Sequence, residues 1–495
     1  MAIGADTNSR KEFQLHIPYM VQELIKLTHV CRYWRNTAIS SALLWRYIPI
    51  GKPYTYRSYG TTLELELVRR SGQTHLNLLA HCSTDDEAAI VISELFRVVA
   101  LEYAPTGVYV LPAGTVNAPI LRSLTVDASY RDIDDLPIPI PFIAPDSPLP
   151  MLTSLEMKGM GYRDIVPFLR PTLKRLHLIS MDDSPSMSDF LHALTSMPQL
   201  EDLEINDMFA FRAPSTVPLS HVRLPSLRNV WINDSLPAVT ELLNHLVFPA
   251  HTFFKSHSDF HYEYNPEFLD IPWEAAQQMF FHSMLLKLTG YNLIGPIPKI
   301  EALHIKDRTV HAFRGSSQRP YFTAYTADDF PCVSSILAEI HWSSSTNLLA
   351  GIKELVLEAP LDPGGEAALA SMFPFFVNLT TLRLIQTPEV WRYLARAHCH
   401  LDELPSDHLP LPRLKKLSMT GARASQVPIV AWNDACKTEF LTSLRDMLKA
   451  RWDAKIPLRE LSLHYPIAFS ERDDLPLLQE FVKTVRCYRR YKSRS

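Results

Sequence analysis

Long apolar runs are absent from the chain. No stretch of its 495 residues approaches the roughly 18–20 uncharged apolar residues that a membrane-spanning helix requires. The N-terminus, MAIGADTNSRKEF, carries Asp6 and Glu12 and has no apolar core of the kind found in secretory signals. We therefore expect no membrane partner and a location in the cytoplasm, the nucleus or both.

Closely spaced cysteines are also absent. The six cysteines include no C-x-x-C pair, whereas disulfide frameworks and structural zinc sites need closely spaced ligands. The densest group of metal-capable side chains is His398-Cys399-His400, and adjacent residues rarely converge on one tetrahedral ion. We expect reduced thiols, no metal and no cofactor.

Neither sign of charge is in large excess. The chain has 49 basic and 53 acidic residues, a formal net charge of −4, so it has no general attraction for nucleic acid. One basic cluster stands near the C-terminus, and we interpret it as the solvated end of a terminal helix rather than a nucleic-acid patch. It comprises Arg486, Arg489, Arg490, Lys492 and Arg494.

Known catalytic motifs are missing as well. The sequence contains no nucleophile elbow, P-loop, dinucleotide fingerprint or zinc-protease helix. Acidic pairs such as Asp182-Asp183 stand where helix caps or loops are expected, which favours capping over acid–base catalysis. A hydrolase site hidden in 250–345 would need convergent titratable residues that the sequence does not show. We predict that the protein is not an enzyme.

What the chain does contain is a repeated pattern, L-x-x-L-x-L, in which Ile, Val or Met can replace Leu. Several successive copies begin 27 residues apart, which is a spacing typical of leucine-rich repeats. Seven of the ten copies have proline two residues before the first aliphatic residue, although proline is only 38 of 495 residues. The ten copies begin at Leu121, Leu152, Leu173, Leu200, Leu227, Ile300, Ile352, Leu379, Leu414 and Leu458.

Each copy predicts a short strand followed by a helix. Proline cannot continue a helix, so it ends one and starts the next strand. After one such strand, Ser188 or Asp189 can cap a helix whose apolar stripe is Phe190, Leu191 and Leu194. Units of this kind stack, so we predict an α/β leucine-rich-repeat solenoid of parallel strands alternating with helices.

Outward positions of these strands would form the concave face on which solenoids usually bind partners. Trp231 is notable because tryptophan and arginine are frequent among interface hot spots, although an insertion could instead cover it. Aromatic runs in the longer insertions near 250–299 and 308–345 are interpreted as local core. The candidate partner-binding residues are Arg175, His177, Glu204, Trp231, His304 and Arg383.

The N-terminal residues 22–50 have a different pattern. Leu24, Leu27, Cys31 and Trp34 recur at helical spacing, which predicts an amphipathic helix, followed by a short apolar helix around Leu43–Trp45. The string VCRYWRNTAISSALLWRYI resembles the C-terminal half of the F-box in fungal F-box proteins. The matching positions are Val30, Cys31, Arg32, Trp34, Arg35, Leu44, Trp45 and Ile48.

In that family the F-box docks on a Skp-family adaptor, which is linked to a cullin and a RING subunit, and the repeats capture the protein to be ubiquitinated. The resemblance implies a substrate-recognition subunit of an SCF-type ubiquitin ligase with an unknown protein substrate. The family usually opens with Leu-Pro-x-Glu, where this chain has Ile17-Pro18. The implied adaptor-binding residues are Leu27, Val30, Cys31, Trp34, Leu44 and Trp45.

Two alternatives stay open from the residues. The chain could be a non-catalytic leucine-rich-repeat scaffold that has lost adaptor binding. Trp34 and Trp45 could be core residues between the helical module and the first repeat rather than adaptor contacts. The expected organisation is an F-box-like helical module truncated in its N-terminal half (1–51), a connecting helical segment (52–95), the irregular solenoid (96–470), and a C-terminal helix with a basic tail (471–495).

Overall fold

The computed structural model describes most of the chain in two compact units. Unit 1 is Met1–Ala210 with Val222–Leu227, and unit 2 is Phe211–His221 with Arg228–Ser495. The described residues are 21, 23–51, 61–105, 117–129, 149–209, 219–258, 273–297, 299–306, 309–315, 317, 319–326, 346–358, 369, 372–385, 411–420, 434–464 and 474–488. Ile17-Pro18, His398-Cys399-His400 and the basic residues after Tyr488 lie outside them.

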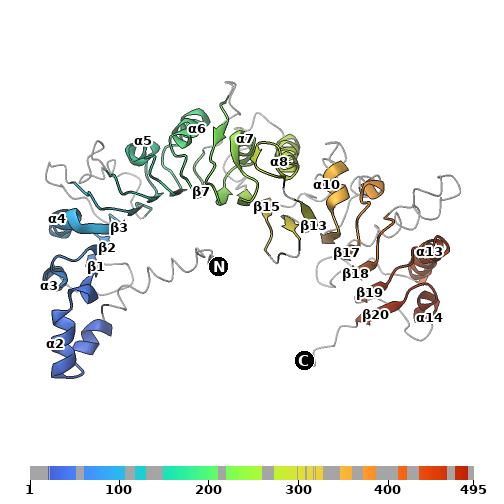
Figure 1. Cartoon of the computed structure of the whole chain (residues 1–495), viewed down its shortest axis with the longest axis horizontal. Helices are drawn as coiled ribbons and strands as arrows, with labels where there is room; N and C mark the ends of the chain where they lie inside the picture. The colour runs from blue at the N-terminus through green and yellow to red at the C-terminus, as the bar shows by residue number, and fades with distance from the viewer. Residues whose placement is uncertain are drawn as a thin grey trace. The chain divides into compact units, whose positions relative to one another are not determined.

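Unit 1 is built on a parallel sheet in which each strand pairs with the next strand along the chain. The helices from α3 (Thr61–Ser71) to α6 (Met187–Thr195) alternate with the strands and lie mainly on one side of them (Figure 1). The expected mixed α/β architecture with a mostly parallel sheet is confirmed. The strands are β1 (Tyr47–Gly51), β2 (Leu76–His81), β3 (Val98–Tyr103), β4 (Ser123–Asp127), β5 (Ser154–Lys158), β6 (Arg175–Ile179) and β7 (Asp202–Asn206), with β8 (Val222–Arg223) apart.

The helices of unit 1 are short. The expected apolar stripe Phe190, Leu191 and Leu194 is buried, but the helix begins earlier than predicted. Its cap is Ser186, whose hydroxyl accepts a hydrogen bond from the Asp189 amide. The helical elements are α2 (Arg32–Ser40), η1 (Ala42–Trp45), α3 (Thr61–Ser71), α4 (Asp85–Glu94), η2 (Leu95–Arg97), α5 (Tyr162–Ile165), η3 (Val166–Phe168) and α6 (Met187–Thr195).

The sheet starts earlier in the chain than the sequence predicts. β1 lies inside the segment 1–51 that was expected to be helical, and β2 lies inside the connecting segment 52–95. Both strands are rich in buried apolar residues, which is typical of parallel strands covered on both faces. Register joins Tyr47 to Asn77 and Ile50 to Ala80, so the helical segment at 23–45 leads directly into the sheet.

The strands of unit 2 also pair mostly in parallel, and a hairpin interrupts the parallel order. β14 pairs antiparallel with both β13 and β15, and β15 pairs in parallel with β11. The remaining pairings, from β13 through β16 to β20 and from β9 to β11, are parallel. The strands are β9 (Asn229–Asn233), β11 (Phe253–Ser258), β13 (Ile300–Lys306), β14 (Thr309–Arg314), β15 (Phe322–Thr326), β16 (Glu354–Glu358), β17 (Thr381–Ile385), β18 (Lys416–Thr420), β19 (Glu460–His464) and β20 (Thr484–Tyr488).

The last strand differs from the prediction of a C-terminal helix end. Arg486 lies in β20, which pairs in parallel with β19, so the sheet continues past residue 470. Buried Phe254 and Phe322 stack at 4.7 Å between ring centroids, which confirms local core in the insertions for these two residues. The other elements are α7 (Leu236–His245), β10 (Leu246–Pro249), α8 (Trp273–Leu288), β12 (Leu293–Ile294), α10 (Thr346–Gly351), η6 (Phe373–Phe375), α13 (Asp434–Asp453) and α14 (Asp474–Gln479).

The recurring proline has a defined position in both units. In the first copy, the Leu121 amide donates to the Ala118 carbonyl at 3.2 Å, so Pro119 is the second residue of a hydrogen-bonded turn. Proline favours this position because its fixed φ suits the turn. The turn ends at the first aliphatic residue of the copy. That aliphatic residue is buried in all ten copies. The same bond ends at Leu152, Leu173, Leu200, Leu227 and Leu414 in copies with this proline.

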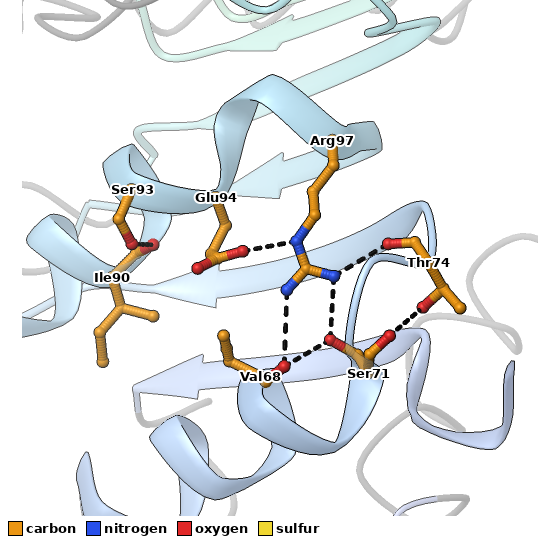
Figure 2. Close-up of polar contacts among 7 residues, drawn as sticks. All are labelled: Val68, Ser71, Thr74, Ile90, Ser93, Glu94 and Arg97. Atoms are coloured by element: carbon orange, nitrogen blue, oxygen red, sulfur yellow. Dashed lines mark hydrogen bonds and ion pairs between the residues drawn. The ribbon is translucent and has the colours of Figure 1, made fainter. Parts of the chain in front are cut away.

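A buried arginine holds the first helices of unit 1 to its sheet. The Arg97 guanidinium donates to Glu94 at 2.6 Å, to the Ser71 hydroxyl at 3.0 Å and to the Thr74 carbonyl at 2.9 Å. Figure 2 shows these bonds together with the longer one to the Val68 carbonyl. Because α3, its following turn and α4 all contribute acceptors, Arg97 fixes the entry of β3.

Candidate protein-binding surfaces

The N-terminal helical segment is broken where one helix was expected. Residues 23–28 are helical, His29 and Val30 form a turn, and α2 begins after Cys31. The Cys31 sulfur caps α2 by accepting from the Trp34 amide at 3.5 Å. Arg35 Nε donates to the Thr28 carbonyl at 2.9 Å, which ties the second helix to the end of the first.

The two tryptophans of this segment have different environments. Trp45 is 1% exposed, and its Nε1 donates to the Ala38 carbonyl at 2.8 Å. The Arg70 guanidinium lies 4.9 Å from its ring, so Trp45 is a core residue that joins α2 and α3. Trp34 is 52% exposed and has no such cover. Of the six implied adaptor-binding residues, Trp45 is therefore inaccessible in this structure.

The other five implied adaptor-binding residues are exposed, and further apolar side chains are exposed between them. An isolated exposed leucine is ordinary, but a concentration of large apolar side chains in one short segment indicates an interaction site. We call this set the helical apolar surface. It consists of Leu27, Val30, Tyr33, Trp34, Ile39, Leu43 and Leu44.

The solvent-facing side of the unit 1 sheet is predominantly acidic. His177 stands between two carboxylates, with Nδ1 3.4 Å from Glu204 and 3.9 Å from Glu156. Arg175 pairs with Asp202 at 3.3 Å on the neighbouring strand. Among the described residues of β3 to β7, the acidic face consists of Glu102, Asp127, Glu156, Asp202 and Glu204, together with His177 and the cations Lys158 and Arg175.

The carboxylates of the acidic face change the pKa of Lys158. Burial lowers its pKa, but Glu156 at 3.1 Å and Asp127 at 3.6 Å outweigh burial and raise the pKa above its ordinary value. The ammonium therefore stays charged. A cationic group on a partner would meet the same pair of carboxylates, so the acidic face is suited to basic partner side chains.

The corresponding side of the unit 2 sheet is aromatic and basic. Strand register aligns one central row that contains no carboxylate. His257 contacts Tyr325 with ring centroids 4.2 Å apart. We call this side the aromatic–basic face. Its central row is Trp231, Lys255, Thr323, His311, His304, Val356, Arg383, Ser418, Ser462 and Arg486.

Carboxylates on the aromatic–basic face lie beside the central row and pair with its cations. Glu354 forms an ion pair with Arg383 at 3.1 Å and lies 4.0 Å from His304 Nε2. Glu460 lies 3.5 Å from Arg486. Burial is the main cause of a lowered pKa at His304, so its imidazole is neutral near pH 7 and can accept a hydrogen bond.

Trp231 is half-buried, and the Lys255 ammonium lies 4.2 Å from its ring centroid. The covering residue comes from β11, which belongs to the expected insertion near 250–299. Trp231 Nε1 has no hydrogen-bond partner among the described residues. Lys255 therefore covers part of the Trp231 ring. A partner protein would have to displace Lys255 to contact that part.

The six predicted partner-binding residues all lie in strands, namely β6, β7, β9, β13 and β17. Arg175, His177 and Glu204 lie on the acidic face, whereas Trp231, His304 and Arg383 lie on the aromatic–basic face. The two groups belong to different units. Sequence reasoning missed Lys255 and His311, because their strands were assigned to insertions. The alternation in FFKSHS, with burial at every second residue, is the signal that could have found β11.

Comparison with models of known protein families gives no match, and comparison with curated proteins gives none either. Within the described ranges, no helix is both long and apolar enough to cross a membrane. No group of three or more His, Cys, Asp or Glu side chains among those same residues could hold a metal ion.

Proposed function

We propose that this chain is an F-box protein, the substrate-recognition subunit of an SCF-type ubiquitin ligase. In this proposal the helical apolar surface docks on a Skp-family adaptor, which connects through a cullin to the catalytic subunits. The solvent-facing sides of the strands, organised as a leucine-rich-repeat solenoid, bind the target protein. The observation that carries the proposal is the exposure of Leu27, Val30, Trp34 and Leu44 within the segment that resembles the F-box.

Adaptor binding would be driven mainly by burial of this apolar surface. Fully burying one large apolar side chain contributes about 1.5–3 kcal/mol. Trp34 is 52% exposed and Leu44 is 39% exposed, so burying the remaining area of each contributes roughly half of that value. A micromolar affinity corresponds to about 8 kcal/mol, so it would need several residues of the helical apolar surface. Trp45 supports the docking surface indirectly, because it fixes α2 against α3.

The target-binding role rests on the side chains of the strands in the two units. Parallel strands hold their alternate side chains at fixed spacing on one side, so a partner meets a rigid array of charges and rings. The chain would supply recognition only, and ubiquitin transfer would be carried out by the associated subunits. A repeat scaffold without adaptor binding shares this recognition role but does not use the helical apolar surface.

Co-purification with a Skp-family adaptor tests the proposal. The wild-type chain should form a complex at micromolar concentration, and the double variant Trp34→Ala/Leu44→Ala should bind about tenfold or more weakly. Phe96→Ala is the matched control, because Phe96 is as exposed as Trp34, at 52%, and lies outside the segment.

Loss of adaptor binding in the double variant with an unchanged Phe96→Ala control would support the ligase role. If the wild-type chain forms no complex with the adaptor, the ligase role is wrong and the scaffold alternative is favoured. Circular dichroism of each variant should match the wild type, since none of the three side chains is buried.

A further inference from the structure

Unit 2 contains an open groove that belongs to neither sheet face. Its volume is about 680 Å³, within the range of about 300–1,000 Å³ that is usual for ligand sites. The groove lies where β18, β19 and β20 begin and where α13 ends. Its lining includes Lys415, Arg459 and Lys483 from the strand starts, and Trp452 and Lys455 from the end of α13.

Three of the lining cations form a row. Lys415, Arg459 and Lys483 each directly precede the first residue of a strand. The Arg459 amide donates to the Lys415 carbonyl at 2.8 Å, and the Thr484 amide donates to the Arg459 carbonyl at 3.1 Å. Neighbouring strands are about 4.8 Å apart, so the row places three positive charges at regular intervals across the sheet.

Among the described residues that line the groove, positive side chains outnumber negative ones. Arg413 and Lys455 bring the number of lining cations to five, whereas Glu480 is the single acidic residue of the lining. No carboxylate among the described residues forms an ion pair with any of these five cations. Arg413 instead donates to the neutral Asn378 side chain at 2.6 Å. Like charges held this close together favour an anionic ligand.

A buried arginine shapes the groove wall. Arg451 is 0% exposed, and its guanidinium donates to the Leu411 carbonyl at 3.1 Å and to the Leu414 carbonyl at 3.0 Å. These bonds join the last turns of α13 to the turn that precedes β18. The helix then closes with Lys455 at a φ of 60°, whose amide donates to the Trp452 carbonyl. Trp452 is consequently held at the groove while remaining 50% exposed.

The residues that line the groove favour one kind of anionic ligand over others. A compact phosphate is usually held by a helix N-terminus or a glycine-rich loop, but α13 presents its C-terminus here and no glycine lines the groove. A long nucleic acid would have to follow a chain whose net charge is −4. A short acidic peptide fits the linear row of cations, and an apolar side chain beside its carboxylates would contact Trp452 and Ile456.

We propose that this groove binds an acidic peptide segment of a partner protein, with its carboxylates on Lys415, Arg459 and Lys483. Trp452 packs against a neighbouring apolar side chain of that peptide. The site is separate from the helical apolar surface and does not depend on adaptor binding. It gives the chain a second point of attachment for a protein partner, distinct from both sheet faces.

The test is fluorescence polarisation with the full chain and a labelled peptide in which Glu and Asp alternate with Leu. We expect micromolar binding that weakens as salt is added. The double charge reversal Lys415→Glu/Arg459→Glu should weaken binding by about tenfold or more. Lys449→Glu is the matched control, because Lys449 is an exposed lysine of α13 outside the groove.

Trp452→Ala provides a second measurement, since it leaves the cations in place and should weaken binding less than the double reversal. Absence of peptide binding to the wild-type chain would overturn the proposal. An equal loss in Lys449→Glu would also overturn it, because binding would then reflect overall charge. Tighter binding of an oligonucleotide or of inorganic phosphate than of the peptide would assign the groove to those ligands. None of these outcomes alters adaptor co-purification, which depends on residues 27–44.

Discussion

The two units share a parallel-strand plan but carry opposite charge on the solvent-facing sides of their sheets. In unit 1 five carboxylates surround Lys158 and Arg175, whereas the central row of unit 2 carries Lys255, Arg383 and Arg486 without a carboxylate. Buried aliphatic positions recur in both units, and they determine where the strands form. Outward positions are free of that constraint, so their charge can differ between the two units.

The units also differ in how they bury a cation. Arg97 in unit 1 is paired with Glu94 at 2.6 Å and has three further acceptors. Lys287 in unit 2 donates to the Leu246 carbonyl at 2.6 Å and lies 5.0 Å from the Phe248 ring, and no described carboxylate pairs with it. Burial without a paired carboxylate lowers the pKa of the Lys287 amine.

The largest effect on stability is expected from Arg97→Ala. This change leaves Glu94 without its partner in a mostly buried position, which typically costs about 3–5 kcal/mol in free energy of unfolding. Urea unfolding followed by circular dichroism measures the loss. The double variant Arg97→Met/Glu94→Gln should recover part of it, because no unpaired charge remains. Equal stability of Arg97→Ala and the wild type would show that the cluster in Figure 2 is not structural.

A smaller, pH-dependent effect is expected from Lys287. Burial lowers its pKa from 10.5 to about 7, so between those values the unfolded chain binds a proton that the folded chain does not. The free energy of unfolding should therefore rise with pH across this window, by at most about 1.4 kcal/mol per pH unit. The same group should contribute no slope below about pH 7, where both states are protonated.

Lys287→Met isolates this contribution, because it keeps most of the side-chain volume and removes the titrating amine. The titratable groups nearby are His245 and His221, and burial is the main cause of the lowered pKa of His245. The lowered pKa places the titration of His245 below neutral pH, so it should not imitate a slope above pH 8. An unchanged slope in Lys287→Met would assign the pH dependence to another group.

The smallest effect on stability is expected at the sheet faces. Arg175→Ala and Arg383→Ala each remove an ion pair whose arginine is about half exposed, and such pairs contribute about 1 kcal/mol or less. Thermal unfolding should therefore change little in either variant. A large loss of stability would mean that these side chains hold the sheets together rather than remaining available to a partner.

The repeated strands could be predicted from the sequence because each copy carries its own local signals. The aliphatic spacing set the buried positions, and proline marked the turn before each strand, although its exact place in that turn required the hydrogen bond from Leu121 to Ala118. The stripe on α6 was equally local. Its cap at Ser186 was missed because several polar residues precede the helix and any of them could serve.

Features that depend on contacts distant in the chain could not be predicted in this way. Trp45 is of a residue type that is frequent at interfaces, and only its contacts with Ala38 and Arg70 show that it belongs to the core. β20 lacks the repeat pattern and is defined by pairing with β19. The cation row at Lys415, Arg459 and Lys483 arises only when three separate strand starts are aligned.

Amide hydrogen exchange of the full chain, with and without a Skp-family adaptor, would show where the adaptor binds. The proposed F-box role predicts added protection within residues 23–45 and unchanged exchange in β4 to β7. Protection confined to the sheet strands, or no change anywhere on addition of the adaptor, would contradict that role.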